Sequence, residues 1–424
     1  MKILLGMILA LLSMGASAQS RIASPTTETF QQLAELTGSQ PFGLFAPSIA
    51  ISGSTLVIGA PGATPPNGCV GCGVAYVYRA VSGDWTNLQL TATLTQSSGQ
   101  SAGGFGTVAV SGDTIVVGGY DSDKGLGAAY VFVSPSGTAT ENAELTTSGA
   151  PSTAFGSVSI DGGTIVAGSP SAQVGSQKEL GAAYVYVEPS GGWADMTQTS
   201  ELVANDESDN SGFGDSVAIS GRTVVVGEPR ANVDGVTVRG RAYVYVEPAG
   251  GWSGTRGQTA ELEPSNGQRN ALFGLSVSVG GATVAVGAPG EDVGSNQAQG
   301  AVYIFSEPAA GWSMTMTQTA EVTAATGKAG SEMGCSVAIS DRMLFTGAPY
   351  VHAEQGIAYV FGEPLGGWQN LAGGEEIRAS DGSANNLFGL GVAIGGGVLG
   401  VSAPYWPDGG LSPDGAVYVF GESQ

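Results

Sequence analysis

The sequence predicts an all-β protein, a seven-bladed β-propeller built from four-stranded antiparallel blades. One phrase of residues recurs seven times at nearly regular spacing, starting near Phe45, Phe105, Phe155, Phe213, Phe273, Met333 and Phe388. Each copy contains short alternating or apolar runs typical of β-strands rather than helices. The two chain ends also supply complementary parts of one copy. These observations favour radial repetition of a small β unit.

The fourth copy shows the four strands in order. Residues 216–220 alternate small and branched side chains, and residues 223–226 are apolar on both faces, as in a buried strand. Pro229 then ends the second strand, because proline cannot donate to a β-ladder. After a variable stretch, residues 242–246 form the third strand and residues 259–263 the fourth. A right-handed β-solenoid is the rival fold, but its coils are usually shorter and parallel.

The ends of the chain fit a closed ring. The last copy stops after residues 416–420 and lacks a fourth strand. Residues 30–38, FQQLAELTG, match the fourth-strand phrase TAELEPSNG of another copy. We therefore expect the N-terminal strand to complete the last blade. An open array would instead carry polar capping repeats, and none is visible.

Residues 1–18 have the features of a secretory signal peptide. Lys2 precedes an apolar stretch over residues 3–14, and Ala16-Ser17-Ala18 forms a small-residue cleavage site. This stretch is short for a membrane span, and every later apolar run is shorter still. We expect a secreted protein, extracellular or periplasmic, without membrane insertion. Residues 19–424 then form a single propeller domain.

The chain is strongly acidic, with a formal net charge of −22, and loss of Lys2 with the signal peptide would give −23. This charge argues against nucleic acid and anionic membranes as partners, since both would be repelled. It is compatible with an extracellular protein or glycan as ligand, and we expect a monomer.

Two of the three cysteines lie close together. Cys69 and Cys72 stand in the segment NGCVGCG. In an exported protein without a second ligand pair, a local disulfide is favoured over a metal site. Cys335 replaces a small residue at a strand and is expected to be a buried apolar thiol.

The recurring phrases resemble the FG-GAP family, the repeat of the integrin alpha-chain head. The resemblance rests on pieces such as Phe213-Gly214, Phe273-Gly274, Gly287-Ala288-Pro289 and Gly347-Ala348-Pro349, together with GAVYIF from Gly300. They recur in order over essentially the whole chain after residue 18. The resemblance implies a seven-bladed propeller used in extracellular recognition.

Calcium is not carried over from this resemblance. Several integrin blades hold calcium in a loop between the first and second strands. Here those connections are short, as in Gly221-Arg222 and Asp341-Arg342, and they lack the six to eight oxygen ligands that calcium takes. We predict no metal site and no cofactor.

The long loops are the predicted binding surface. In an antiparallel four-stranded blade, the 2–3 and 4–1 connections lie on one face, and here they are long and differ between copies. Function tends to reside on variable loops held by a rigid scaffold. The candidate ligand-binding residues are Asp121, Asp123, Arg230, Asp234, Arg239, Glu291, Asp292, His352, Glu354, Trp406, Asp408 and Asp414.

Two kinds of tryptophan are distinguished. Trp406, beside acidic residues, could stack on a sugar ring or cover the channel. The others recur just after the turn that follows the third strand, which indicates packing rather than binding; they are Trp85, Trp193, Trp252, Trp312 and Trp368.

The leading hypothesis is a non-catalytic recognition or adhesion scaffold that binds a protein or glycan. No catalytic residue is predicted, because His352 is the only histidine and no nucleophile, zinc or nucleotide motif is present. One alternative is a carbohydrate-active enzyme, a polysaccharide lyase or hydrolase, which would require Arg230, Arg239, His352 and Glu354 to converge. The other alternative is a structural matrix or surface protein. Fold alone does not decide among them.

Overall fold

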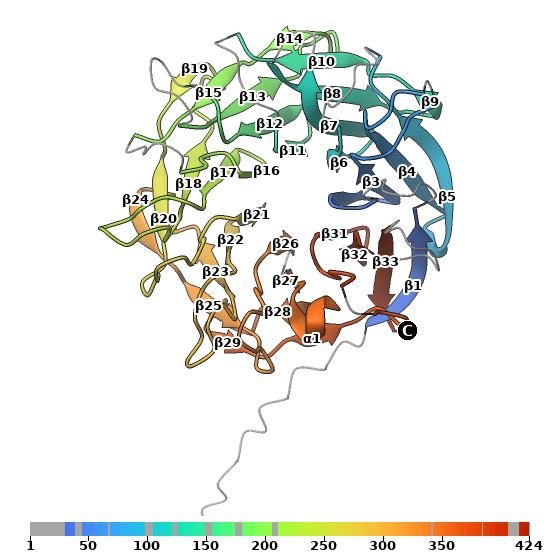
Figure 1. Cartoon of the computed structure of the whole chain (residues 1–424). Coiled ribbons are helices and arrows are strands. Elements are labelled where there is room, and N and C mark those ends of the chain that lie inside the picture. Colours follow the sequence, from blue (N-terminus) through green and yellow to red (C-terminus); the bar gives the residue numbers. More distant parts are fainter. Residues whose placement is uncertain are drawn as a thin grey trace, which may run out of the picture.

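Seven β-sheets surround a central axis in the computed structural model, counted over the described residues (Figure 1). The structure describes residues 30–38, 45–66, 68–97, 105–121, 126–148, 155–173, 180–205, 211–340, 342–383, 385–405 and 415–423. Each sheet contains four antiparallel strands, in chain order from the axis outward in six sheets and completed by the N-terminal strand in the seventh, which confirms the predicted propeller. The expected signal peptide lies outside the described residues.

The first four blades follow the chain. Blade one contains β2 (Ile49–Ser52), β3 (Thr55–Ala60), β4 (Val74–Val81) and β5 (Asp84–Leu94). Blade two contains β6 (Thr107–Ser111), β7 (Thr114–Asp121), β8 (Leu126–Val133) and β10 (Ala143–Thr146). Blade three contains β11 (Ser157–Asp161), β12 (Thr164–Ser169), β13 (Ala182–Val187) and β15 (Ser200–Leu202). Blade four contains β16 (Ser216–Ser220), β17 (Thr223–Glu228), β18 (Arg241–Val246) and β20 (Ala260–Glu263).

The last three blades close the ring. Blade five contains β21 (Ser276–Gly280), β22 (Thr283–Ala288), β23 (Ala301–Ser306) and β25 (Ala320–Thr323). Blade six contains β26 (Ser336–Ser340), β27 (Met343–Ala348), the short helix α1 (Val351–Glu354), β28 (Ile357–Gly362) and β30 (Glu375–Ile377). Blade seven joins β31 (Val392–Gly395), β32 (Val398–Ala403) and β33 (Ala416–Glu422) to the N-terminal strand β1 (Phe30–Thr37). The β1–β33 pair is antiparallel, as expected from the matching ends (Figure 1).

Five blades carry a fifth strand that the sequence did not predict. In each case, the strand comes from the next blade, whose connection between the third and fourth strands was expected to be only a short turn. That connection contains a strand of two to four residues, which pairs in parallel with the outer edge of the blade before it. These strands are β9 (Gly137–Ala139), β14 (Met196–Thr197), β19 (Gly254–Arg256), β24 (Met314–Thr317) and β29 (Leu371–Ala372). Covering an outer edge protects it from pairing with another chain. The recurring tryptophans near these connections are buried, as expected for packing: Trp85, Trp193, Trp252, Trp312 and Trp368.

The Phe-Gly and Gly-x-Pro pieces form the joints between blades. The buried ring of Phe213 packs on Tyr243 of its own blade, with ring centroids 5.6 Å apart. Its backbone forms a parallel bridge to Gly181 of the preceding blade. Gly227 in turn lies so near the following blade that a β-carbon there would overlap the carbonyl oxygen of Gly274. The corresponding overlap would occur at Gly168, Gly287 and Gly347. The recurring phrase is therefore explained by the close approach of neighbouring blades.

We expect Gly227→Ala to destabilise the protein by about 1–3 kcal/mol, because the added methyl group overpacks this joint. Thermal and urea unfolding would measure the change. Gly250→Ala is the matched control, since its β-carbon meets no atom within 4 Å and Gly250 is outside the left-handed region. Equal stabilities of the two variants would contradict this account of the joint.

Candidate functional site

The long loops lie together on one face of the ring. In blade four, the loop between β17 and β18 receives backbone hydrogen bonds from the loop that leads to blade five: Asn270 N–H donates to the Thr237 carbonyl, and Phe273 N–H to the Arg239 carbonyl, both at 3.1 Å. Blade five repeats this, with Met333 N–H on the Gln299 carbonyl at 3.0 Å. We call this surface, made of the 2–3 and 4–1 loops, the long-loop face. In the described residues of blades four and five, these loops brace one another through backbone atoms.

In blade four, the candidate residues are engaged in ion pairs. Arg230 contacts Asp215 at 2.8 Å, and burial raises the pKa of Asp215 while the guanidinium opposes that rise. Arg239 is largely buried; it lies 3.5 Å from both Asp234 and Glu263 and donates to the Pro264 carbonyl at 2.7 Å. Arg239 thus fastens its loop to the blade, whereas Arg230 and Asp234 stay exposed.

In blade five, the two candidates belong to the inside of the loop. Asp292 accepts a hydrogen bond from the Ala298 amide at 2.8 Å, which closes a tight turn. Glu291, expected on the surface, is fully buried. Burial raises the pKa of Glu291 to about 7. Glu291 is therefore an interior acid rather than a solvated loop charge.

In blade six, both candidates lie on the helix α1. His352 and Glu354 are exposed and have left-handed backbone angles, with φ of 54° and 66°. His352 Nδ1 lies 3.3 Å from the Arg378 guanidinium, which also contacts Glu376 at 2.7 Å. The hydrogen bond from Thr326 and the Arg378 charge lower the pKa of Glu376.

The structure does not gather the residues that an enzyme hypothesis required. Arg230 and Arg239 belong to blade four, and His352 and Glu354 to blade six. Within the described residues, the ion pairs of Arg230 and Arg239 stay within blade four and its adjoining loop. The contact of the His352 ring with Arg378 likewise stays within blade six and its adjoining loop. These four residues therefore give no support for a shared catalytic cluster.

Five candidates have side chains outside the described set. Asp121 ends β7, but its side chain is not among those described. Four further candidates fall outside the described residues: Asp123, Trp406, Asp408 and Asp414.

Sequence reasoning missed two exposed tyrosines on the long-loop face. Tyr350 and Tyr405 are 38% and 43% exposed and begin the 2–3 loops of the neighbouring blades six and seven. Burial of part of the ring raises the pKa of Tyr350, and four groups near its hydroxyl raise it further: Cys335, Glu332, Glu354 and Tyr405. We call Tyr350 and these four residues the tyrosine rim. The sequence does contain a signal for these two residues. The residue that follows Gly-Ala-Pro or Ser-Ala-Pro is tyrosine only in these two copies.

Cys335 differs from the apolar thiol that was expected. Its Sγ lies 3.8 Å from a carboxylate oxygen of Glu332, to which it can donate. Burial raises the pKa of this thiol, and the nearby Glu332 charge raises it further. These contacts favour the neutral thiol form of Cys335 within the tyrosine rim.

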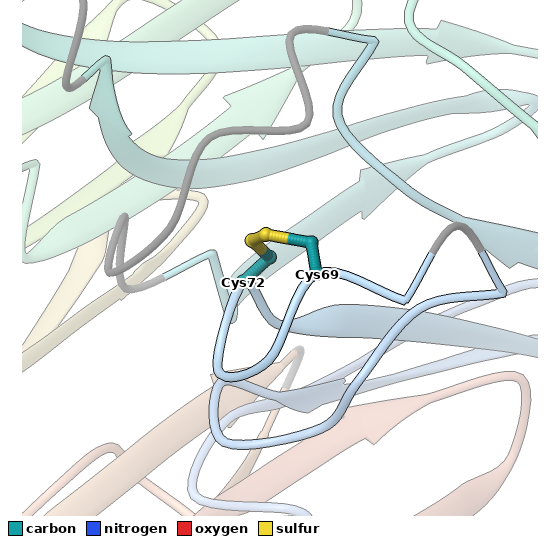
Figure 2. Close-up of a disulfide and its surroundings, with 2 residues drawn as sticks. All are labelled: Cys69 and Cys72. Carbon is teal, nitrogen blue, oxygen red and sulfur yellow. A yellow bond between two sulfur atoms is a disulfide. The ribbon is translucent and has the colours of Figure 1, made fainter.

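Cys69 and Cys72 are joined as a disulfide in the 2–3 loop of blade one (Figure 2). Cys72 is buried just before β4 and Cys69 is more exposed, so the bond closes a turn within the loop. This loop therefore has a covalent brace in addition to its backbone hydrogen bonds.

The opposite end of the axis holds a cavity of about 530 Å³, lined by the first strands and the 1–2 turns. Its polar side chains link neighbouring blades. Ser52 accepts from the Gly112 amide at 3.2 Å, and Asp161 accepts from the Gly221 amide at 2.6 Å. Ser111 and Ser220 accept from the next turns in the same way. This regular pattern points to blade alignment as the role of these groups.

Neither a metal cluster nor a membrane-spanning helix occurs in the described part of the chain. No group of three or more His, Cys, Asp or Glu side chains there is placed to hold a metal ion. No helix in the same residues is long and apolar enough to cross a membrane.

A closed ring with braced, variable loops on one face defines a β-propeller of the ligand-binding scaffold class. Five segments match the FG-GAP repeat: residues 88–132, 196–245, 257–305, 316–361 and 374–420. Together they cover more than half of the sequence, and each contains one of the blade joints described above. The chain belongs to the FG-GAP repeat family. No curated protein shows significant similarity to it.

Proposed function

We propose that the protein is a secreted, non-catalytic recognition scaffold that binds an extracellular glycan through the long-loop face. The tyrosine rim carries this proposal. Tyr350 and Tyr405 offer two exposed aromatic rings on neighbouring blades, beside the carboxylates of Glu332 and Glu354. Aromatic rings pack on the apolar faces of sugars, and carboxylates accept hydrogen bonds from sugar hydroxyls.

The scaffold supports this function in two ways. Paired backbone loops and the closed ring hold the rim residues in place, so little ordering entropy is lost on binding. The acidic charge disfavours anionic polymers and leaves neutral or cationic ligands. The proposed export rests on the sequence of residues 1–18. A protein ligand would use the same exposed tyrosines, which are favoured anchors at interfaces.

Binding of residues 19–424 to a broad glycan array tests the proposal. We expect saturable binding to one sugar class and a loss of about tenfold or more in affinity for Tyr350→Ala and Tyr405→Ala, as for anchor residues. Leu365→Ala is the control, because Leu365 is 96% exposed in a 3–4 turn and so lies away from the long-loop face.

The outcomes separate the alternatives. Binding that survives both tyrosine substitutions would overturn the role of the rim. A blank array combined with tyrosine-dependent capture of an extracellular protein would replace the glycan with a protein ligand. Turnover of a bound polysaccharide would contradict the non-catalytic assignment.

A further inference from the structure

Glu291 is a buried carboxylate whose oxygens make no well-formed hydrogen bond. It lies in the loop between β22 and β23, its side chain has no exposed surface, and neither oxygen has a partner with hydrogen-bond geometry. An ionised carboxylate in such a place is costly unless a positive group compensates it. The described residues provide no ion pair to it.

Further polar groups surround this carboxylate. Glu321 on β25 lies directly opposite Tyr303 on β23, and its charge acts on Glu291. Asn266 bridges Tyr303 and Glu321. Tyr303 Oη donates to Asn266 Oδ1 at 3.1 Å, and Asn266 Nδ2 donates to Glu321 Oε2 at 3.2 Å. The Gln268 backbone and the Tyr303 hydroxyl approach Glu291 and oppose the rise in its pKa, although neither has full hydrogen-bond geometry. Two carboxylates and two neutral side-chain oxygens thus lie in one neighbourhood.

Blade four shows how the same position is neutralised by the protein itself. One repeat earlier, Glu261 lies opposite Tyr243 as Glu321 lies opposite Tyr303, and Arg241 contacts Glu261 at 2.8 Å. The residue in place of Arg241 in blade five is Ala301. Blade five therefore has the glutamate but no arginine at the position equivalent to Arg241.

The two blades also differ at the position of Glu291. Blade four combines Ala231 with Arg241, whereas blade five combines Glu291 with Ala301. Both alanines are buried. Blade five thus has an acid at the first of these positions, whereas blade four has a base at the second. Blade six again provides an arginine, since Arg378 contacts Glu376, the equivalent of Glu321.

Blade five also has smaller side chains at the positions beside its tyrosine. In blade four, the buried Glu228 accepts a hydrogen bond from the Tyr243 hydroxyl at 2.7 Å. The residue in place of Glu228 in blade five is Ala288. Two large side chains of blade four, Glu228 and Arg241, are therefore alanines in blade five, and only Glu291 is added. Blade five therefore has fewer charged side chains of its own at these positions than blade four.

We infer that blade five binds a hard metal cation, with calcium as the best match, between the carboxylates of Glu291 and Glu321. Oxygen-only donors select calcium over zinc or copper, and calcium accepts carboxylate, amide carbonyl and water oxygens together. The side-chain oxygen of Asn266 and water molecules would complete the donor set, and the Tyr303 hydroxyl would help to position Asn266. The protein supplies two carboxylates here, matching a doubly charged cation, and the neighbouring Asp292 adds further negative charge.

The site has a location of its own, and one of its carboxylates borders a cavity. Glu321 lines a cavity of about 260 Å³ together with Val293, Thr323 and Asn370. The site lies where a 4–1 loop meets β23 and β25, away from the 1–2 turns where integrin blades hold calcium. It is also separate from the tyrosine rim, so its test does not depend on glycan binding.

Calcium titration of the full chain at pH 8, by calorimetry and by thermal unfolding against EDTA, tests the inference. We expect one calcium ion to bind and to raise Tm by a few degrees, because a ligand of the native state stabilises it. Glu291→Gln should weaken calcium binding by about tenfold or more. Glu307→Gln, an exposed carboxylate of the same blade, should leave it unchanged.

A second variant keeps the test decisive if Glu291→Gln folds poorly. Glu291→Ala combined with Ala301→Arg recreates the Ala231–Arg241 pair of blade four, and it should fold in EDTA and show no Tm response to calcium. Absence of calcium binding to the natural chain would overturn the inference. So would full calcium binding by either Glu291 variant, since the ion would then lie elsewhere.

Discussion

A chain that begins after Thr37 is expected not to fold into a monomeric propeller. Residues 30–37 form β1, which pairs with β33 from Phe30↔Glu422 to Thr37↔Ala416. Leu33 and Leu36 pack on the core between blades seven and one, and Phe30 packs on the core between blades six and seven. The Phe30 amide donates to Glu375 of blade six at 2.9 Å. Removing β1 thus breaks contacts with three blades at once.

We expect the loss to exceed about 5 kcal/mol, the lower end of the stability of natural domains. Circular dichroism and size-exclusion chromatography would report an unfolded or aggregated chain. The control is a circular permutant in which a short glycine-serine linker joins Gln424 to Phe30 and the new chain begins at residue 39. It should recover the natural melting profile, because Phe30 lies directly opposite Glu422. A truncated chain with native stability would show that β1 does not close the ring.

Phe213→Ala should destabilise the protein by about 3–5 kcal/mol, the range found when a buried aromatic residue is truncated. The Phe213 ring is fully buried and contacts Tyr243 and Tyr245, with ring centroids 5.6 and 6.4 Å away. Its removal leaves a cavity beside the backbone bridge to Gly181, which weakens the joint between blades three and four. Urea unfolding would measure the change.

The repeats themselves provide the control for this substitution. Blade six has Met333 where blade four has Phe213, and Met333 is equally buried. Phe213→Met should therefore cost less than about 1.5 kcal/mol, as expected for a hydrophobic replacement of similar volume. Equal losses for alanine and methionine would indicate that the aromatic ring, rather than filled volume, is required.

The fold was predictable because its determinants are local and repeated. Phe213, Gly227 and their counterparts recur at fixed places in each copy, and they are the residues that join the blades. Strand order followed from the alternation of residues and from Pro229 at a strand end. Closure followed from the match between residues 30–38 and a fourth strand.

The parts that could not be predicted depend on contacts between copies. Strands such as β14 and β29 contain two residues, and only the edge of the preceding blade makes them strands. Arg239 and Glu291 both looked like surface charges, yet one is held by Glu263 and the other is enclosed by its own loop. Tyr350 and Tyr405 belong to different copies, and their proximity arises only when blades six and seven are placed side by side.

The pairing of β1 with β33 also has a consequence for the order of events during synthesis. Phe30 emerges from the ribosome long before its partner Glu422, because most of the propeller lies between them in the sequence. The first strand therefore waits, with both of its edges unpaired, while six blades assemble behind it. Contacts between such distant residues form late and slowly. A ribosome that stalls before residue 416 releases an open ring with an unsealed edge, which proteases and chaperones can distinguish from the finished molecule.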